Sequence, residues 1–448
     1  MIIKSKNIII KTMKNSYINN NYFNWFNNPD VKKYIKFSPK SLVHLKQNVI
    51  RIIKEKNSFF FGIFHNNKHK GNLRIHSINY ETNEAWLGIL IGDESFRNKG
   101  YAKEAINCIK RWLVKKNIFF IKLEVHKSNK PAIKLYKSCN FEVFKRKNIS
   151  YIMINNNYLS KLVLGSAQFR SKYGVSNIKR KIMNTNEVDN IISFINLKKS
   201  EINEIDTAIN YKFTTKDLNK IKKPIFLNNK IHTNDNISYQ NLKRFFNKKN
   251  GYKVNTIYIH DGDNVLSKKG INLLKKLKKL KRAKIINKVG LSIHDISSLK
   301  NILNKFSFDV LQIPYSFVDR RAEKYFKIIN NKNIEIQVRS IFLQGALLSK
   351  IKTNRKLSSI FEKFNYLSKK KHKNRIRYVL SFILKNKYID KIIVGVRNLK
   401  ELKQINNLNY LYNNLNKLNV LESKDHEIIN PLNWKELTLD DKKTIRSI

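Results

Sequence analysis

The stretch Leu162-Val163-Leu164-Gly165 begins the part of the sequence that decides the fold. It is a short apolar run, as expected for a buried strand, and a longer segment with helical spacing follows it. This alternation repeats along the rest of the chain. The eight runs are Leu162–Leu164, Glu204–Asp206, Ile225–Lys230, Thr256–His260, Lys288–Ser292, Val310–Ile313, Ile334–Ser340 and Lys391–Val394. Eight strands separated by helices are typical of a (β/α)8 TIM barrel.

The first 157 residues have a different rhythm, which predicts an α+β unit with a mixed central sheet and helices. The expected strands are Ile8–Thr12, Phe59–His65, Lys70–Ile78, Ala85–Ile91, Ile121–His126, a strand near Phe141 and Ile149–Ile154, and the expected helices are Asn21–Ile35, Leu42–Lys56, Ala102–Lys116 and Pro131–Ser138. The polar tripeptide Asn155-Asn156-Asn157 marks the expected boundary, because its side chains compete for backbone hydrogen bonds. We therefore predict two domains, residues 1–157 and 158–448.

Composition excludes several classes of protein. Of the 448 residues, 42% are hydrophobic and 11% aromatic, which rules out wholesale disorder. The two cysteines, Cys108 and Cys139, cannot form a disulfide framework. Without a secretory signal or an apolar run near the ~18 residues that a spanning helix needs, the sequence predicts a cytoplasmic protein with reduced thiols.

The net charge of +58 admits two interpretations. One is binding to nucleic acid or to a membrane surface. The other is compositional drift, since Lys, Asn and Ile are all abundant and all have A/T-rich codons. The basic runs Lys275–Lys279 and Lys369–Lys373 are short, and other basic residues are spread along the chain, which favours drift. We expect small-molecule substrates and neither a specific nucleic acid nor a membrane as partner; the oligomeric state stays open.

The stretch Arg97-Asn98-Lys99-Gly100-Tyr101-Ala102 lies between a predicted strand and a predicted helix. Gly100 and the small Ala102 allow a tight turn whose N–H groups point outward, and the helix start adds its positive dipole, so the turn suits a pyrophosphate. Many strand-to-helix turns also use glycine. The stretch resembles the acetyl-CoA-binding signature of the GNAT N-acetyltransferases. Leu123–Phe141 is similar to that family's second signature, with Asn140 where glycine is usual, and Trp25–Val31 resembles the branch of ribosomal-protein and aminosugar N-acetyltransferases.

The GNAT resemblance implies acetyl-CoA as cosubstrate, held by Arg97–Ala102 and by Asn129. It implies that Tyr136 is the general acid and Glu124 the general base, acting directly or through water. The alternatives are that Tyr136 is a helix residue packed on the sheet and that Glu124 is an ordinary strand carboxylate, since the general base varies across this family.

Four side chains capable of proton chemistry lie at strand ends of the second half: Asp206, Tyr211, Lys230 and His260. The carboxyl ends of barrel strands share one mouth, so these residues should gather there. This order resembles the catalytic tetrad of the aldo/keto reductase family. The resemblance implies that Tyr211 donates a proton to the substrate oxygen. A phenol has a pKa of ~10, so the Lys230 cation would favour the phenolate, Asp206 would balance the lysine and His260 would orient the carbonyl.

The same resemblance implies an NADPH site, which we favour over NADH because an arginine fork suits the 2′-phosphate. Ser292 and Gln312 are expected at the nicotinamide amide and Gln404 at the adenine. The remaining expected cofactor residues, over the ring, pyrophosphate and 2′-phosphate, are Arg339, Ser340, Phe342, Gln344, Gly345, Gly395 and Arg397. Arg397 is also readable as a solvated surface arginine. We assign no metal site.

The sequence thus predicts a bifunctional enzyme, an acetyl-CoA-dependent N-acetyltransferase joined to an NADPH-dependent carbonyl reductase. We expect it to act on amino or keto sugars in surface-glycan biosynthesis. One alternative is acetylation of a protein N-terminus, with the barrel as reductase or NADPH-binding sensor. Another is a basic scaffold for nucleic acid, which predicts steeply salt-dependent binding.

Overall fold

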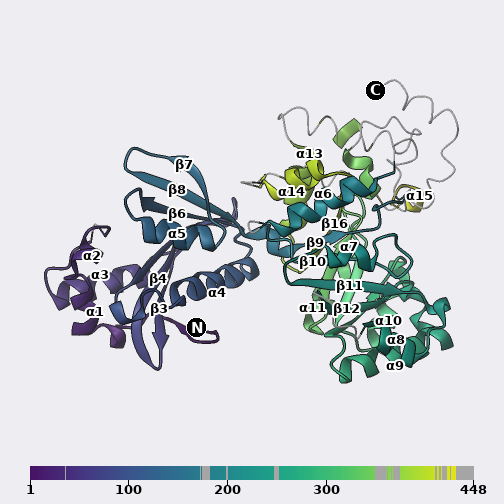
Figure 1. The fold of residues 1–448 in the computed structure, drawn as a ribbon, viewed down its shortest axis with the longest axis horizontal. Coiled ribbons are helices and arrows are strands. Elements are labelled where there is room, and N and C mark those ends of the chain that lie inside the picture. The colour runs from purple at the N-terminus through teal and green to yellow at the C-terminus, as the bar shows by residue number, and fades with distance from the viewer. Residues whose placement is uncertain are drawn as a thin grey trace. The chain divides into compact units, whose positions relative to one another are not determined.

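The computed structural model describes residues 1–35, 37–171, 173, 182–197, 200–246, 252–348, 360, 362–364, 366, 374–408, 411–412, 415, 421–423 and 425–429. The chain divides into two compact units, Met1–Tyr158 and Leu159–Ile448 (Figure 1). The basic run Lys369–Lys373 lies outside the described residues.

The first unit is built on an eight-stranded sheet in the order β1-β2-β3-β4-β5-β6-β8-β7. The strands are β1 (Ile2–Lys4), β2 (Ile9–Thr12), β3 (Phe59–His65), β4 (Lys68–Asn79), β5 (Glu84–Ile91), β6 (Phe120–His126), β7 (Glu142–Arg146) and β8 (Ser150–Asn156). The helices are α1 (Asn20–Trp25), α2 (Pro29–Lys32), α3 (Leu42–Lys54), α4 (Tyr101–Lys115) and α5 (Lys130–Ser138). Only β5 and β6 pair in parallel, and the other pairs are antiparallel. The predicted mixed sheet with helices is confirmed.

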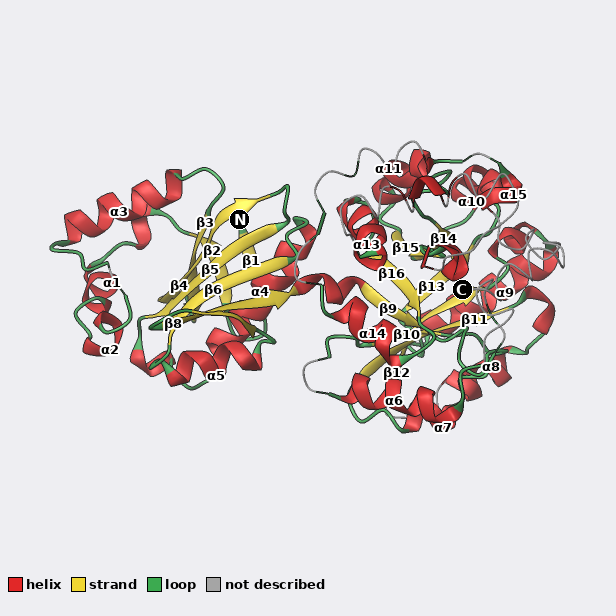
Figure 2. Ribbon diagram, turned by 90° about the horizontal axis from the view of Figure 1, so that it is seen from above, coloured by secondary structure: helices red, strands yellow, loops and turns green. Residues whose placement is uncertain are grey.

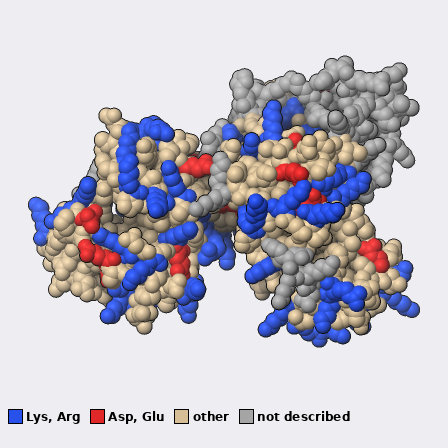
Figure 3. Space-filling view, in the orientation of Figure 1, with Lys and Arg blue, Asp and Glu red and all other residues tan. Residues whose placement is uncertain are grey.

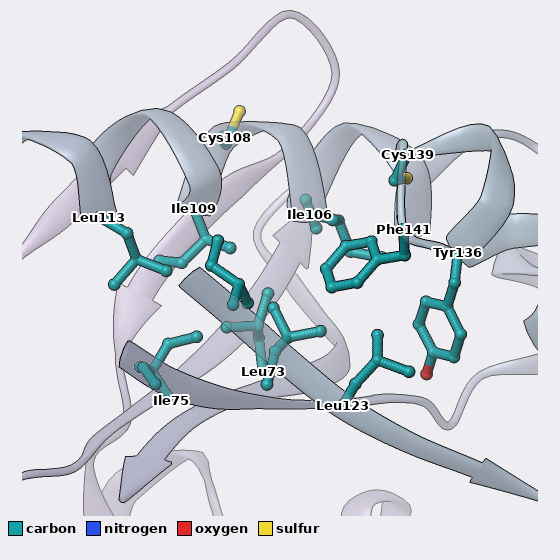
Figure 4. Packing of buried hydrophobic residues seen from close by; sticks show 14 of the residues in the cluster. Leu73, Ile75, Ile106, Cys108, Ile109, Leu113, Leu123, Tyr136, Cys139 and Phe141 are labelled. Atoms are coloured by element: carbon teal, nitrogen blue, oxygen red, sulfur yellow. The ribbon is translucent and has the colours of Figure 1, made fainter. Parts of the chain in front are cut away.

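Two clusters of buried side chains hold the helices to the sheet. Successive residues of a strand point to opposite faces. Accordingly, Phe61 of β3 packs in the cluster that contains α4 and α5, whereas the neighbouring Phe60 packs with α1 and α3. Figure 4 shows Ile109 of α4 above Leu73 of β4 in the first cluster. The apolar stripe of α4 thus fixes the helix whose first turn was predicted to hold a cofactor.

One prediction for this unit needs correction. The helix expected over Asn21–Ile35 is broken into α1 and α2, because Pro29 begins a new helix and lacks the N–H needed to continue the first. The expected boundary tripeptide Asn155–Asn157 spans the end of β8 and the start of the turn after it, directly before the division between the two units. Asn155 is buried and its Nδ2 donates to the carbonyl oxygen of Asn140 at 2.8 Å, so the side chain fastens β8 to the rest of the unit.

The second unit contains a closed barrel of eight parallel strands, surrounded by helices (Figure 2). The strands are β9 (Leu162–Gly165), β10 (Glu204–Asp206), β11 (Ile225–Ile231), β12 (Tyr252–Ile259), β13 (Lys288–Ser292), β14 (Val310–Pro314), β15 (Glu335–Arg339) and β16 (Lys391–Gly395). The helices are α6 (Thr185–Asn196), α7 (Thr215–Asn219), α8 (Tyr239–Phe246), α9 (Lys268–Arg282), α10 (Leu299–Lys305), α11 (Glu323–Asn331), α13 (Arg375–Lys385), α14 (Leu399–Asn406) and α15 (His426–Ile429). All eight predicted runs form strands, which confirms the TIM barrel.

The charged side chains do not form one basic patch on the face shown in Figure 3. Lys and Arg are scattered over both units there, with acidic side chains between them. Among the described residues, none of the helices has the length and apolar character needed to cross a bilayer.

Candidate active sites

A pocket of about 610 Å³ lies at the carboxyl ends of the barrel strands. Asp206, Tyr211, Lys230 and His260 all line it. Asp206 and Lys230 form a buried ion pair between neighbouring strands, since each is about 4% exposed. Lys230 Nζ lies 5.8 Å from the centroid of the Tyr211 ring, and the ring centroids of Tyr211 and His260 are 6.0 Å apart. The topology therefore brings the four predicted residues to one place.

The protonation states of these groups follow from burial and pairing. Burial raises the pKa of Tyr211 above its ordinary value, and Tyr173 and Asp206 raise it further. Asp206, which pairs with Lys230, is thus among the groups that oppose the expected lowering of this pKa. Burial lowers the pKa of Lys230, and Asp206 opposes that shift. Tyr211 is consequently a protonated phenol at neutral pH, which is the state needed to donate a proton.

His260 is uncharged at neutral pH. Burial lowers its pKa to about 3, and the nearby Lys230 and other basic groups contribute. The ring centroid of His232 lies 4.2 Å from that of His260. Nδ1 of His260 is buried and has no hydrogen-bond partner among the described residues. A neutral imidazole in this position can hydrogen-bond a substrate oxygen without adding charge.

The residues expected at the nicotinamide amide are both buried in the same pocket. Gln312 Nε2 donates to Asp206 Oδ2 at 2.9 Å, and Ser292 Oγ lies 3.4 Å from Gln312 Oε1. The glutamine therefore also supports the carboxylate that pairs with Lys230. The other predicted cofactor residues that line the pocket are Arg339, Ser340, Phe342, Gln344, Gly345, Gly395 and Arg397.

The loop after β15 has an unusual backbone. Ser340, Leu343, Gln344 and Gly345 all have positive φ, at 58°, 46°, 53° and 91°. Three of the four are not glycine, so the loop stores strain that the surrounding packing must hold. Such strain is common where a backbone clamps a ligand. Its place on the pocket wall fits the predicted contact with ring and pyrophosphate.

Arg397 is not a solvated surface residue, because its side chain is only 16% exposed and is paired with Glu401. Its Nε donates to Glu401 Oε1 at 2.8 Å, and its backbone N–H donates to Oε2 at 2.8 Å. Its Nη1 is buried and has no partner among the described residues. Gln404 shares a neighbouring pocket of about 510 Å³ with Arg397 and Glu401. An orphaned guanidinium nitrogen at a pocket wall fits a phosphate oxygen.

In the first unit, the predicted acetyl-CoA turn has the expected geometry. Gly100 has a φ of +80°, faces open space and precedes α4 without a side-chain cap. The N–H groups of the first turn therefore remain available to an anion. Arg97 Nη1 pairs with Asp30 Oδ2 at 3.0 Å, and the Tyr101 ring stacks on Phe96 with centroids 4.2 Å apart. Asn98, with a φ of +60°, and the neighbouring Lys99 are exposed, and Ala102 follows in the first turn of α4.

The sheet opens beside this turn. β5 and β6 pair only from Glu84 with Phe120 to Trp86 with Lys122, and further along each strand pairs only with its other neighbour. Helices α4 and α5 both begin at this edge, since each follows the carboxyl end of one of the two parallel strands. Asn129 caps α5, where its Oδ1 accepts from the N–H of Ala132 at 3.1 Å. Because this cap occupies Oδ1, the expected contact of Asn129 with CoA would be made by its amide nitrogen.

Glu124 and Tyr136 are placed differently from one another. Glu124 of β6 is exposed and accepts from Lys147 Nζ at 3.0 and 3.1 Å, and also from Ser150 Oγ. Tyr136 of α5 is 8% exposed and packs near Phe141 (Figure 4). Burial raises the pKa of Tyr136 to about 12. Its ring therefore serves the core, while its protonated hydroxyl suits proton donation.

Three participants were not foreseen from the sequence. Glu401 is spaced i, i+4 from Arg397 on a helix start, a pattern that could have revealed the pair. His294 contacts Arg339, with Arg339 Nη2 3.0 Å from His294 Nδ1. Asp263 accepts from the backbone N–H of His294 at 2.9 Å and so anchors that loop. The residues of this contact are far apart in sequence, and no local pattern signals it.

A barrel with Asp, Tyr, Lys and His at its mouth defines a reductase, and a mixed sheet with a phosphate-cradling turn defines an acyltransferase. The chain belongs to the aldo/keto reductase family, whose model matches residues 161–425, more than half of the chain. The model of the acetyltransferase (GNAT) family matches residues 22–141. The chain is an enzyme with an N-acetyltransferase domain followed by an NAD(P)H-dependent oxidoreductase domain. GNAT folds use acetyl-CoA, and aldo/keto reductases use NAD(P)H.

Solved structures that resemble about a third of the chain include several acetyltransferases. A ribosomal-protein-S5-alanine acetyltransferase from Vibrio fischeri is 16% identical, with 35% of this chain and 97% of that chain covered and a TM-score of 0.31. A spermidine N-acetyltransferase from Vibrio cholerae, in complex with CoA and spermine, is 20% identical, with 34% and 94% covered and a TM-score of 0.30. A ribosomal L7/L12 α-N-protein acetyltransferase in complex with coenzyme A is 13% identical, with 35% and 98% covered and a TM-score of 0.32. None of the curated proteins matches the chain.

Proposed function

We propose that this enzyme reduces a carbonyl with NADPH and acetylates an amine with acetyl-CoA on amino or keto sugars of surface-glycan biosynthesis. The observation that carries the reductase half is the gathering of Asp206, Tyr211, Lys230 and His260 around one pocket. The amino or keto sugar is proposed because the two domains are fused. A sugar that has both a carbonyl and an amine could be a substrate of both reactions. The sugar substrate is inferred by analogy, and the assays with competing acceptors test it.

In the reductase, the chain holds and delivers a proton, and NADPH supplies the hydride. Tyr211 gives its phenolic proton to the substrate oxygen as the carbonyl carbon is reduced. The neutral His260 donates a hydrogen bond to the same oxygen and so fixes its orientation. The Lys230 cation stands beside the tyrosine ring and favours the phenolate that forms, whereas its partner Asp206 opposes that effect.

In the acetyltransferase, Tyr136 returns a proton to the departing thiolate of CoA. Its high pKa keeps the hydroxyl protonated until the thiolate forms. Glu124 takes a proton from the incoming amine, directly or through a water, and must loosen its contact with Lys147 to do so. The turn at Gly100 and the first turn of α4 hold the pyrophosphate through backbone N–H groups.

NADPH rather than NADH is proposed from the 2′-phosphate end of the pocket. Arg397 offers an unpartnered Nη1 there, and Gln404 lies along the same wall for the adenine. The cytoplasm is the proposed location, because both cofactors are intracellular metabolites. The proposed substrate of each domain is a small molecule.

The test assays the purified full chain for NADPH oxidation with aldehydes and keto sugars, and for acetyl transfer to amino sugars and to N-terminal peptides. Tyr211→Phe should abolish only reduction, and Tyr136→Phe only acetylation, since the two hydroxyls serve separate sites. Higher kcat/KM with peptides than with amino sugars would replace the sugar acceptor with a protein N-terminus. Absence of both activities on all sugars would contradict the proposal.

A further inference from the structure

Four lysine and arginine side chains line the barrel pocket, and three of them are paired with carboxylates. Lys230 pairs with Asp206, Arg321 with Asp319 and Arg397 with Glu401. The fourth cation, Arg339, differs from them. In the part of the chain that the structure describes, no carboxylate pairs with Arg339. The pocket therefore contains one guanidinium whose charge is not balanced.

The neighbours of Arg339 are neutral acceptors. Its Nη2 lies 3.2 Å from the carbonyl oxygen of Ile293 and 3.0 Å from His294 Nδ1, and its Nη1 lies 3.5 Å from Ser340 Oγ. Because a guanidinium only donates, His294 accepts through Nδ1 and carries its proton on Nε2. These contacts fix the guanidinium plane without compensating its charge. Partly buried charges without a counter-ion are costly, and a ligand that supplies one binds strongly.

The position of Arg339 is beside the reacting groups. Its charge acts on Tyr211, Lys230 and His260, whose pKa values it lowers. Arg397 lies after β16 and also lines the neighbouring pocket that contains Gln404, so it serves another part of the site. The ring of an oxidised nicotinamide is itself cationic and does not neutralise a guanidinium. A counter-ion at this end of the pocket must then come from the substrate.

We propose that Arg339, with the Nε2–H of the His294 imidazole beside it, binds an anionic group of the carbonyl substrate, a carboxylate or a phosphate. This rests on the proposed reductase function and moves Arg339 from the expected cofactor contacts to the substrate. The substrate is then a sugar acid or a phosphorylated sugar within the proposed class. The anchoring of the His294 loop by Asp263 keeps the two donors in place before the substrate arrives.

The test compares aldehydes that differ only in the anion. The pairs are 4-carboxybenzaldehyde with benzaldehyde, and D-glyceraldehyde 3-phosphate with D-glyceraldehyde. The wild-type full chain should show at least about tenfold higher kcat/KM for the anionic member of one pair, as expected for a charge-assisted hydrogen bond. The pair that shows the preference identifies carboxylate or phosphate. Arg339→Met should remove the preference by slowing only the anionic aldehyde, and Arg339→Lys should keep part of it.

Controls distinguish a failure of the Arg339 assignment from a failure of the proposed reductase function. Arg282→Met removes the same charge from the exposed end of α9 and should leave the preference intact. The Kd of NADPH, measured by fluorescence, should change less than about twofold in Arg339→Met. If NADPH binding instead weakened tenfold while the preference for the anionic aldehyde remained, Arg339 would be a cofactor-binding residue. Equal rates for both members of each pair would overturn the inference alone. A wild-type enzyme that reduces none of the four aldehydes would overturn the reductase proposal, and this inference with it.

Discussion

Lys230 and Asp206 form an ion pair that is almost entirely removed from solvent, with each side chain about 4% exposed. Gln312 completes the arrangement by donating to the other carboxylate oxygen at 2.9 Å. Two charges in such a position stabilise the fold only while both are present, because a single unpaired charge is costly to bury. The pair therefore links the stability of the barrel to its chemistry.

Asp206→Asn should both weaken the barrel and slow reduction. The loss of the carboxylate leaves Lys230 charged and unpaired, so unfolding of the barrel should become easier by about 3 kcal/mol or more. The rate of NADPH oxidation should fall at least ~100-fold. Hydrogen exchange at β11 and a reductase assay measure the two effects. The double variant Asp206→Asn with Lys230→Met should regain stability without regaining activity; recovery of activity would show that the pair is not part of the chemistry.

His260 should make the barrel less stable in mild acid. An unfolded chain protonates this imidazole below its ordinary pKa of 6.5, but the folded barrel does so only near pH 3. The unfolded state thus binds more protons between these values, and stability should fall as the pH drops from 7 to 5, by about 1 to 2 kcal/mol for this group. Hydrogen exchange at β12 in the full chain, at pH 7 and 5, measures the change. His260→Gln should lose less stability over this range, and an equal loss in both proteins would contradict the assigned shift.

The strands and the catalytic quartet could be predicted because both depend on patterns local to the sequence. Buried parallel strands are continuous apolar runs, and the residue that ends such a run must lie at the mouth of the barrel. The break at Pro29 was also readable, since proline marks a helix start more often than a helix interior. The hydrogen bond from Asn155 to the carbonyl oxygen of Asn140 could not be predicted, because only the folded sheet brings β8 to that turn.

The electrostatics of the site could not be predicted in the same way. Asp206 was expected to balance Lys230, but the same carboxylate also raises the pKa of Tyr211, an effect that depends on burial and distance. The contact between Arg339 and His294 joins the end of β15 to the loop after β13, so neither residue signals the other in sequence. The pairing of Glu124 with Lys147 likewise joins β6 to the turn between β7 and β8, which are distant from β6 in sequence.

That pairing gives a test of the general base in the acetyltransferase. Lys147→Met should release Glu124 and raise the rate of acetyl transfer two- to fivefold, since an exposed ion pair contributes at most about 1 kcal/mol. Glu124→Gln should lower the rate at least about tenfold. Single-turnover transfer from acetyl-CoA measures both. Lys145→Met removes a neighbouring exposed cation of β7 and should leave the rate unchanged; an equal response of the two lysine variants would assign the effect to general charge instead of Glu124.

The pair of Arg397 and Glu401 should set the choice between NADPH and NADH. Glu401 occupies Nε of the guanidinium and repels a phosphate brought near it, while Nη1 remains without a partner. Glu401→Gln removes the competing charge, so the Kd for NADPH should fall about tenfold, an effect of the size of one charge-assisted hydrogen bond. The Kd for NADH should change little, since it carries no 2′-phosphate. Fluorescence titration of the full chain with each nucleotide measures both values.

Arg397→Gln supplies the opposite change in the same pair. It should weaken NADPH at least about tenfold and NADH less than about twofold, because only the 2′-phosphate loses a donor. Titration with 2′,5′-ADP, which carries the phosphate but no nicotinamide, should follow the NADPH result in both variants and so locate the effect at the adenosine end. If Glu401→Gln instead weakened both nucleotides equally, the carboxylate would be needed to shape the loop after β16, and the pair would not determine which nucleotide is chosen.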